Sequence, residues 1–312
     1  MNQGWIYREQ VKYQDVGETV LEYYTTRYLH SSEFQWQARI ESGQILLDDR
    51  IAVAATELKL GQHLIYHRAP WSEPEVPLSF EVLYEDQDLL VVAKPSGLPV
   101  MPGGGFLEHT LLWQLKTRYP LDTPVPIHRL GRGTSGLLLL GRSHLAKSSL
   151  SKQMRENTVD TQENRHINNV YHVLIKNNPI SDRFTISNPI GKIPHPVLGY
   201  VYGATTEGKF ARSDCRVMER HRNRTLVEVT ILTGRPHQIR IHLAAAGYPL
   251  LGDPLYLAGG IPRNTAIAGE KLPVPGDCGY YLHAYQLSFT HPRSFQRMNL
   301  ECPVPDAWKL VY

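Results

Sequence analysis

The segment PIHRLGRGTSGLLLLGRS, residues 126–143, carries the most structural information in this sequence. Its run of four leucines, 137–140, is typical of a short buried strand. A loop containing Gly131, Gly133 and Gly136 comes before that strand, and glycine lets a backbone approach a ligand closely. Exposed amides in such a loop can hold an anion. The segment therefore predicts a ligand-binding loop at the end of a sheet, the alternative being a tight turn with surface arginines. The polar side chains of this loop are His128, Arg129, Arg132, Thr134 and Ser135.

A second segment, LTGRPHQIRIHLAAAGYPLLGDPLY at 232–256, predicts a helix over 236–246 that ends at Gly247. Polar and charged side chains crowd the start of this otherwise apolar helix: Arg235, His237, Gln238, Arg240 and His242. Such side chains are hard to place in a core unless they are paired. His237 and His242 are five positions apart and do not share one helical face, so we expect no metal site here.

Strand-like runs outnumber helical ones in the larger, C-terminal part of the chain, residues 79–312. The expected strands are 80–84, 89–93, 137–140, 171–175, 210–217, 225–232 and 282–289, and the expected helices are 110–119, 144–156 and 236–246. Because strands and helices do not alternate regularly, the pattern predicts an α+β fold with a mixed or antiparallel sheet.

Residues 1–68 form a small module of their own in this interpretation. Helical stretches at 18–29 and 31–43 precede two strand-like runs, QILLDD at 44–49 and HLIYHR at 63–68, which we expect to form a hairpin. Three prolines follow in HRAPWSEPEVPL, and proline stiffens an extended chain. We therefore expect a linker over 69–78 between the module and the large domain, 79–312.

Composition excludes several classes of protein. The formal net charge of +3 over 312 residues is compatible with a polyanionic partner without requiring one. Cys215, Cys278 and Cys302 are far apart and form no CxxC pair, so neither a disulfide framework nor a zinc site is expected. The first residues lack the pattern of a secretory signal, and no apolar run is long enough to span a bilayer. A cytoplasmic protein fits best, with organellar targeting left open.

Five segments, taken together and in order, resemble the RluA-type RNA pseudouridine synthase family. They are YEDQDLLVVAKPSGLPVMPG (84–103), HRLGRGTSGLLLL (128–140), VYHVLIK (170–176), LTGRPHQIRIHLAAAGYPLLGDPLY (232–256) and LHAYQLSFTHP (282–292). Several motifs in one order are far more specific than any one of them. Residues 1–68 are also similar, more loosely, to the αL-type RNA-binding module that many of these enzymes carry.

The resemblance implies a pseudouridine synthase fold and a reaction on RNA. A uridine already in the chain is isomerised: its glycosidic carbon–nitrogen bond breaks, the uracil turns, and a carbon–carbon bond forms. No cofactor or metal is needed. The partner is a structured ribosomal or transfer RNA whose target base leaves the helical stack. We expect the enzyme to be a monomer.

The resemblance also implies roles for particular residues. Arg129 helps to displace the flipped base, Tyr171 lies against the uracil, and Arg240 sits beneath the catalytic carboxylate. Leu137 and Leu243 help to wall the pocket. The residues expected to contact RNA are His128, Arg129, Arg132, Thr134, Ser135, Arg235, His237 and Gln238.

The sequence departs from the family pattern at the position of the catalytic Asp, which is Gly131 here. Glycine has no side chain and can supply neither a nucleophile nor an acid–base group. A buried arginine left without its carboxylate costs about 3–5 kcal/mol. Arg240 should therefore pair with another acid or face solvent or an RNA phosphate. Candidate replacement acids are Asp86, Asp122, Asp214 and Asp253.

Three functions are consistent with these observations to different degrees. The first is an active pseudouridine synthase in which another group replaces the acid. The second is a non-catalytic RNA-binding protein whose loop, free of acids, grips phosphate. The third, a hydrolase of small nucleosides, needs a pair of positioned carboxylates, and the spacing of the acids predicts no such pair.

Overall fold

The computed structural model describes residues 1–156, 167–196, 198–265, 269 and 271–308. The chain divides into two compact units. The first is Met1–Glu73 with His195–Gly199, and the second is Pro74–Pro194 with Tyr200–Tyr312. The boundary at Glu73 falls within the proline-rich segment 69–78.

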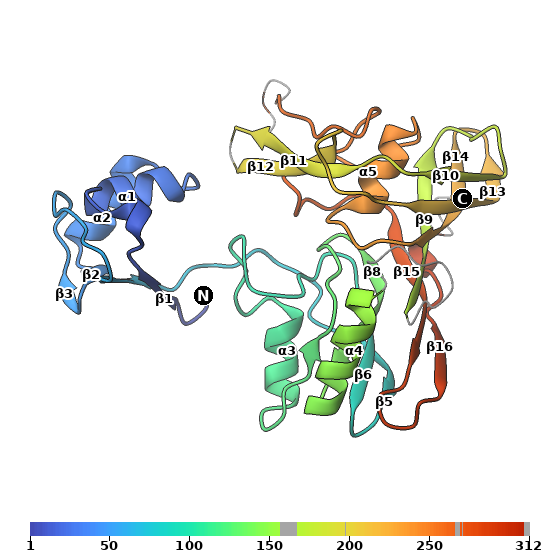
Figure 1. Cartoon of the computed structure of the whole chain (residues 1–312), viewed down its shortest axis with the longest axis horizontal. Helices are drawn as coiled ribbons and strands as arrows, with labels where there is room; N and C mark the ends of the chain where they lie inside the picture. The colour runs from blue at the N-terminus through green and yellow to red at the C-terminus, as the bar shows by residue number, and fades with distance from the viewer. Residues whose placement is uncertain (157–166, 197, 266–268, 270, 309–312) are drawn as a thin grey trace. The chain divides into compact units, whose positions relative to one another are not determined.

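The first unit is a four-stranded sheet with two helices (Figure 1). The strand order is β1-β4-β2-β3. The elements are β1 (Trp5–Gln10), a 3-10 turn (Tyr13–Asp15), α1 (Val20–Arg27), α2 (Glu33–Glu41), β2 (Ile45–Leu47), β3 (Arg50–Ile51) and β4 (His63–Arg68). Each helix begins at a capping box, since Thr19 accepts from the Glu22 amide and Ser32 from the Gln35 amide. An aromatic core that includes Tyr24, Trp36 and Tyr66 joins helices and sheet.

The two runs predicted to form a hairpin pair antiparallel as β2 and β4, and β1 and β3 enlarge this pair to a four-stranded sheet. The strand expected over 44–49 ends at Leu47, because Asp48 and Asp49 have φ angles of 49° and 63° and make a tight turn into β3. β4 then pairs with β2 on one side and with β1 on the other. The sequence pattern did not predict β1, since most of its residues are exposed and show no alternation.

The second unit contains a ten-stranded sheet with the order β10-β13-β14-β9-β15-β8-β6-β5, to which β16 and β7 add at β15 and β8. Its strands are β5 (Glu81–Glu85), β6 (Leu89–Lys94), β7 (Val125–Pro126), β8 (Ser135–Gly141), β9 (Asn168–Lys176), β10 (Arg183–Ile186), β13 (Ser213–His221), β14 (Arg224–Ile231), β15 (Leu282–Thr290) and β16 (Arg297–Glu301). β11 (Ile190–His195) and β12 (Gly199–Ala204) pair separately. All neighbours in the large sheet are antiparallel except β8 and β15. The predicted α+β fold with a mixed sheet is confirmed.

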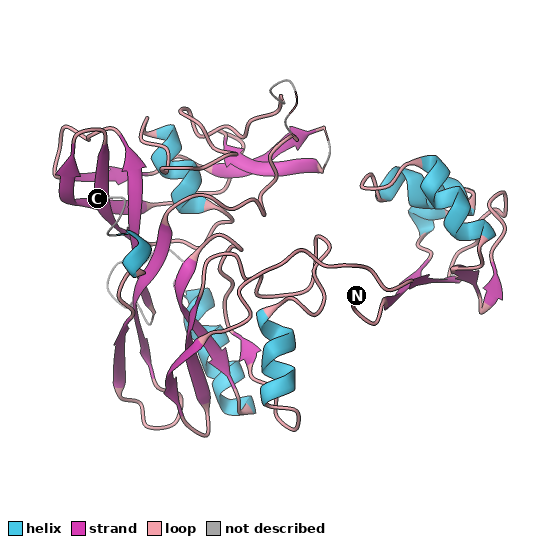
Figure 2. Cartoon of the chain, turned by 180° about the vertical axis from the view of Figure 1, so that it is seen from behind, coloured by secondary structure: helices cyan, strands magenta, loops and turns pink. Residues whose placement is uncertain are grey.

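The helices of this unit are α3 (Leu111–Arg118), α4 (His144–Glu156), α5 (Gln238–Ala245) and a 3-10 turn (Asp306–Trp308). α3 and α4 lie side by side on one face of the sheet near β6 and β8, as both views show (Figures 1 and 2). The leucine run of β8 is buried throughout, which agrees with a strand covered on both faces. α5 begins at Gln238 rather than Pro236, because His237 has the left-handed φ of 54° that places it before the helix.

The parallel pairing of β8 with β15 depends on Gly136. Its φ is +103°, and a Cβ there would lie 2.3 Å from the Ala284 carbonyl oxygen. Only glycine permits this approach. Ala284 pairs with Gly136 on one side and with Tyr171 of β9 on the other. The loop before β8 is thereby brought within two strands of Tyr171.

Candidate active site

The polar loop 127–134 is held by the turn that follows β6. The buried Lys94 Nζ donates to the carbonyl oxygen of Arg132 at 3.2 Å, and also to the carbonyls of Pro95 and Leu98. Ser96 Oγ donates to the Gly133 carbonyl at 2.8 Å. These bonds tie the KPSG and GRGTSG segments together, so the loop is positioned by side chains far away in sequence.

The ring of Tyr280 fills the space beside Gly131 and Gly133. A Cβ at Gly131 would lie 3.1 Å from Tyr280 Oη and 3.4 Å from Thr134 Oγ1. A Cβ at Gly133 would lie only 2.8 Å from Tyr280 Cζ. Tyr280 is 5% exposed, and its Oη is 3.5 Å from Thr134 Oγ1. A side chain at 131 therefore requires a small shift of the Tyr280 hydroxyl, whereas a side chain at 133 collides with the Tyr280 ring.

Arg240 is buried and fully paired. Its Nε and Nη2 donate to Asp253 Oδ2 and Oδ1 at 2.7 and 2.8 Å, and its Nη1 donates to the Pro275 carbonyl. Burial opposes the guanidinium charge, yet the hydrogen bonds with Asp253 leave the pKa of Arg240 raised. The expectation that Arg240 could face solvent or phosphate is wrong, because Arg240 is 2% exposed.

Asp253 has no hydrogen-bonding capacity to spare for chemistry. Its Oδ1 also accepts from the backbone amides of Leu255 and Tyr256 at 2.9 and 3.0 Å, and the side chain is 0% exposed. It closes the turn that follows α5 and neutralises Arg240. Asp253 is therefore the acid that pairs with Arg240, and this pairing leaves the reactive role open.

The other three candidate acids lie in different surroundings. Asp86 accepts from two backbone amides in the turn between β5 and β6 and from His291. Asp214 of β13 is paired with Arg212, and Asp122 is exposed in the loop after α3.

A chain of contacts connects Gly131 with α5. The Arg240 guanidinium lies 4.2 Å from the Tyr280 ring centre and 4.9 Å from that of Tyr256. Tyr256 Oη in turn is 2.8 Å from His237 Nδ1. Because Tyr256 donates its hydroxyl proton to the Tyr202 carbonyl, His237 Nδ1 is the donor in its own bond with Tyr256. Burial lowers the pKa of His237 to about 4, so its ring is neutral at pH 7.

Apolar side chains on the same side of the loop belong to one core cluster, which includes Leu130, Leu137, Tyr171, Leu243 and Tyr280. Tyr171 is 8% exposed, and burial raises its pKa to about 12. Leu137 and Leu243 are almost completely buried. The structure thus places Tyr280 between Gly131 and Arg240, and Tyr171 in the same core cluster as Tyr280.

Three further residues of the predicted site are engaged within the fold. His128 Nε2 accepts from the Leu139 amide of β8 at 3.1 Å. Ser135 Oγ lies 2.8 Å from His283 Nδ1, on the wall of a cavity of about 430 Å³. The Gln238 amide makes four hydrogen bonds to protein groups and is buried. These contacts fix the loop and the start of α5.

Three arginines are better placed to reach a ligand. Arg129 is exposed, and the described part of the chain holds no ion-pair partner for it. Arg132 is half-buried, donates to the Gly276 carbonyl and lies over the Phe106 ring. Arg235 is half-buried and donates to the Phe210 carbonyl. Arg129 has the greatest freedom of the three.

Comparison with known proteins decides the family. The sequence profile of the RNA pseudouridylate synthase family matches residues 88–245. The chain belongs to this family. It is 50% identical over 287 residues to an RNA pseudouridine synthase of Synechocystis sp., covering 92% of this chain and 94% of the relative. It is 42% identical over 327 residues to RNA pseudouridine synthase 5 of Arabidopsis thaliana, covering 92% and 89%.

Solved pseudouridine synthases share the fold. Human RNA pseudouridylate synthase domain containing 1 superposes with a TM-score of 0.54 at 24% identity, covering 75% of this chain and 87% of the human chain. A relative named ribosomal large subunit pseudouridine synthase D, from Nitrosomonas europaea, is 37% identical over 235 residues, covering 74% of this chain and 63% of the relative. The predicted membership of the pseudouridine synthases is confirmed, and with it an isomerase class whose substrates are RNA.

Sequence reasoning missed Tyr280, which lies between Gly131 and Arg240. Tyr280 and Tyr281 directly precede β15, just before the LHAYQ motif that was recognised. The only signal was a pair of tyrosines at the start of a predicted strand, and such a pair usually belongs to a core. Its relation to Gly131 depends on the tertiary fold.

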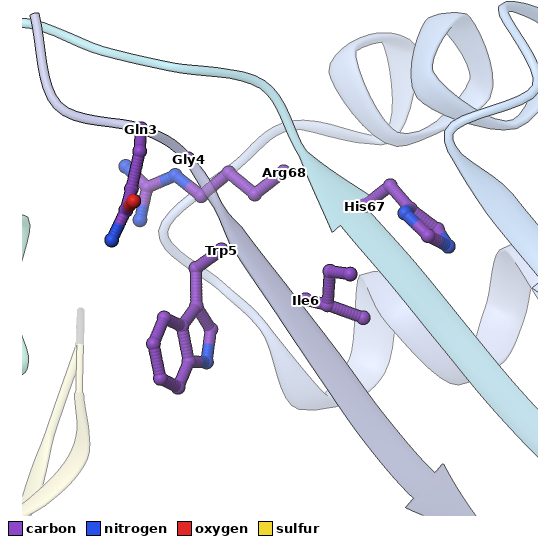
Figure 3. A pocket seen from close by; sticks show the side chains of 6 residues that line it. All are labelled: Gln3, Gly4, Trp5, Ile6, His67 and Arg68. Carbon is purple, nitrogen blue, oxygen red and sulfur yellow. The ribbon is translucent and has the colours of Figure 1, made fainter.

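The first unit of the synthase carries a surface pocket of about 500 Å³ that the sequence did not indicate. Its lining residues are Gln3, Gly4, Trp5, Ile6, His67 and Arg68, at the ends of β1 and β4 (Figure 3). Trp5 is 44% exposed, and the Arg68 guanidinium lies 3.5 Å from the Trp71 ring centre. An exposed indole beside a guanidinium is a surface on which an unstacked base can lie.

Proposed function

We propose that this chain isomerises uridine to pseudouridine in RNA. The observation that carries the proposal is the chain of contacts from Gly131 through Tyr280 to Arg240. Tyr171 belongs to the same core cluster as Tyr280, and the whole arrangement lies in a domain of the RNA pseudouridylate synthase family. The apolar side chains of this region, together with an Arg240 that is fully paired, suit a planar uncharged base.

The arginines at the loop supply the contacts to RNA in this proposal. Arg129 enters the stack where the target uridine leaves it, because it is exposed and has no partner in the described chain. Arg132 and Arg235 contact flanking phosphates. Tyr171 packs against the uracil, with Leu137 and Leu243 behind it. His128, Thr134, Ser135, His237 and Gln238 support these groups through the hydrogen bonds described above.

Ribosomal RNA is the substrate class that we favour, because curated relatives are named ribosomal large subunit pseudouridine synthases. The test is to incubate the purified protein with unmodified ribosomal and transfer RNA and to map pseudouridine by nucleotide. We expect new pseudouridine at one or a few uridines of the large-subunit RNA. Absence of new pseudouridine in every RNA for this chain contradicts the proposal, whether or not its Gly131→Asp variant is active.

A non-catalytic RNA-binding protein is the second candidate. The observation that favours it is Gly131 itself, which has no side chain where the family pattern places the reactive acid. The same mapping experiment separates the two candidates, since an RNA-binding protein without catalysis leaves the RNA unmodified.

The first unit, residues 1–68 with the following segment 69–78, acts in this proposal as an RNA-binding module and its linker. The pocket of Trp5 and Arg68 supports this assignment, because it combines an aromatic surface with positive charge. We propose further that the enzyme is a monomer that needs no cofactor or metal, since the isomerisation only rearranges atoms of the substrate. No described helix could cross a membrane, and the three free cysteines fit a cytoplasmic location.

Two single variants separate charge from stacking in RNA binding. Arg235→Ala should weaken binding mainly at low salt and lower the slope of log K against log salt by about 1, because one contact of a cation with a phosphate is lost. Trp5→Ala should weaken binding by about 1–3 kcal/mol at every salt concentration, because a stacking surface is lost. Fluorescence anisotropy over a salt series measures both. Equal slopes for all three proteins would refute the assignment of Arg235.

A further inference from the structure

The hydroxyl of Tyr280 lies beside the place that the side chain of an acid at position 131 would occupy. We propose that Tyr280 is a catalytic residue of this chain, its hydroxyl moving the proton that the isomerisation requires. The inference rests on the proposed function and names the group that replaces the missing carboxylate.

The position of the hydroxyl is the first observation. Tyr280 Oη is 3.1 Å from the point where a Cβ of residue 131 would stand. Gly131 is exposed and Tyr280 is 5% exposed, and a Cβ at Gly131 would point toward the Tyr280 hydroxyl. A base held where the missing side chain would act would therefore meet the phenol hydroxyl.

Available hydrogen-bonding capacity is the second observation. Within the described chain, the Thr134 hydroxyl is the hydrogen-bond partner of Tyr280 Oη, at the long distance of 3.5 Å. A buried hydroxyl with one such weak partner is costly unless a ligand completes it. The hydroxyl is free to bond strongly to a uracil atom.

The backbone holds the ring firmly in this place. Gly279, the residue before Tyr280, packs against Gly252, where a Cβ would lie 2.1 Å from the Gly279 carbonyl oxygen. Both glycines have positive φ angles, 77° at Gly252 and 114° at Gly279. Since Asp253 follows Gly252 directly, the turn that neutralises Arg240 also positions Tyr280.

The charges around the Tyr280 hydroxyl suit a group that gives up a proton and then takes one back. Burial raises the pKa of Tyr280, and the Arg240 charge works in the opposite direction. The hydroxyl is therefore protonated at neutral pH before reaction. The guanidinium over its ring, 4.2 Å from the centre, stabilises the phenolate that forms during reaction.

The proton balance of the reaction needs one such group. As the bond between C1′ and N1 breaks, its electron pair goes to N1, which takes the proton of Tyr280 and leaves a phenolate. After the uracil turns, the C5–C6 π electrons form the bond from C5 to C1′. The phenolate then removes the proton from C5, which restores the C5–C6 double bond and the phenol. No other reactant is consumed.

Removal of the hydroxyl alone tests the proposal. Tyr280→Phe keeps the ring that packs on Arg240 and fills the space beside Gly133, so the fold should persist. The matched control is Tyr281→Phe, one residue further along, where a half-buried ring contacts Trp308. The assay measures tritium released from RNA labelled at C5 of uridine, because this proton is lost in the reaction.

We expect Tyr280→Phe to release tritium at least about 100-fold more slowly than the unaltered chain, the usual size of an acid–base contribution. RNA affinity should stay within about 2-fold, and Tyr281→Phe should match the unaltered chain. A rate for Tyr280→Phe within a few fold of the unaltered chain overturns the proposal. Faster release by Tyr280→Phe also overturns it, since the hydroxyl would then hinder the substrate.

The activity of the unaltered chain distinguishes failure of this inference from failure of the proposed function. If the unaltered chain forms pseudouridine and Tyr280→Phe forms it equally fast, only the inference fails. If the unaltered chain is inactive, the proposed function fails and the role of Tyr280 fails with it, and activity of Gly131→Asp then shows that the site is still a uridine site.

Discussion

Replacing Gly131 with Asp is expected to increase the rate of pseudouridine formation by at least about 100-fold, because a carboxylate regains the place of the reactive group. The backbone at Gly131 has no left-handed φ, so an L side chain is allowed there once Tyr280 Oη moves by a few tenths of an ångström. Its Cβ would stand 3.1 Å from Tyr280 Oη and 3.4 Å from Thr134 Oγ1, and both hydroxyls can donate to the new carboxylate. Single-turnover kinetics on a responsive RNA measures the change.

Two matched variants control this prediction. Gly131→Asn has the same shape without the charge and should show no gain. Gly133→Asp introduces the same carboxylate two residues away, where a Cβ would lie 2.8 Å from Tyr280 Cζ, and should destabilise the protein by about 1–3 kcal/mol through overpacking. Equal gains for Asp and Asn at position 131 would mean that the carboxylate is not the cause.

The effects of Gly131→Asp and Tyr280→Phe on the rate of pseudouridine formation should also be non-additive. In the Gly131→Asp background the new carboxylate can move the proton, so adding Tyr280→Phe should cost less than about 10-fold. In the unaltered chain the same change should cost at least about 100-fold. Identical losses in both backgrounds would assign Tyr280 a packing role in each.

Asp253→Asn is expected to lower the free energy of unfolding by about 3–5 kcal/mol, because it leaves the Arg240 cation buried without its counter-charge. The pair is 2% and 0% exposed and is joined by two hydrogen bonds, so water cannot replace the lost partner. Urea unfolding followed by tyrosine and tryptophan fluorescence measures the loss. Arg240→Met should cost less, since it removes the charge that needs a partner.

Asp214→Asn is the matched control for burial. Asp214 pairs with Arg212 at 3.2 Å, but the two side chains are 39% and 33% exposed. Water screens such a pair, so we expect a loss below about 1 kcal/mol. If Asp214→Asn destabilises the protein as much as Asp253→Asn does, burial is not what makes the Arg240 pair important.

Runs of apolar residues and helix-ending glycines in the sequence predicted individual strands and helices of the fold. The leucine run at 137–140 became the buried β8, and the apolar stretch that ends at Gly247 became α5. The edge strand β1 escaped prediction because its mostly exposed residues show no alternation. The predicted runs at 44–49 and 63–68 do pair as β2 and β4. The end of the first run was wrong because left-handed turns at Asp48 and Asp49 cannot be distinguished from a polar strand end.

Part of the candidate site could likewise be predicted from the sequence, and part could not. The sequence by itself determined the family, the α+β class, and the loss of a side chain at Gly131, because ordered motifs and a missing functional group are properties of the chain alone. Only the tertiary structure decided that Asp253 neutralises Arg240 and that Tyr280 stands beside Gly131. Tyr280 and Gly131 are 149 positions apart along the chain. The close packing of Gly252 on Gly279 and the pairing of β8 with β15 bring such residues together, and neither contact leaves a local pattern in the sequence.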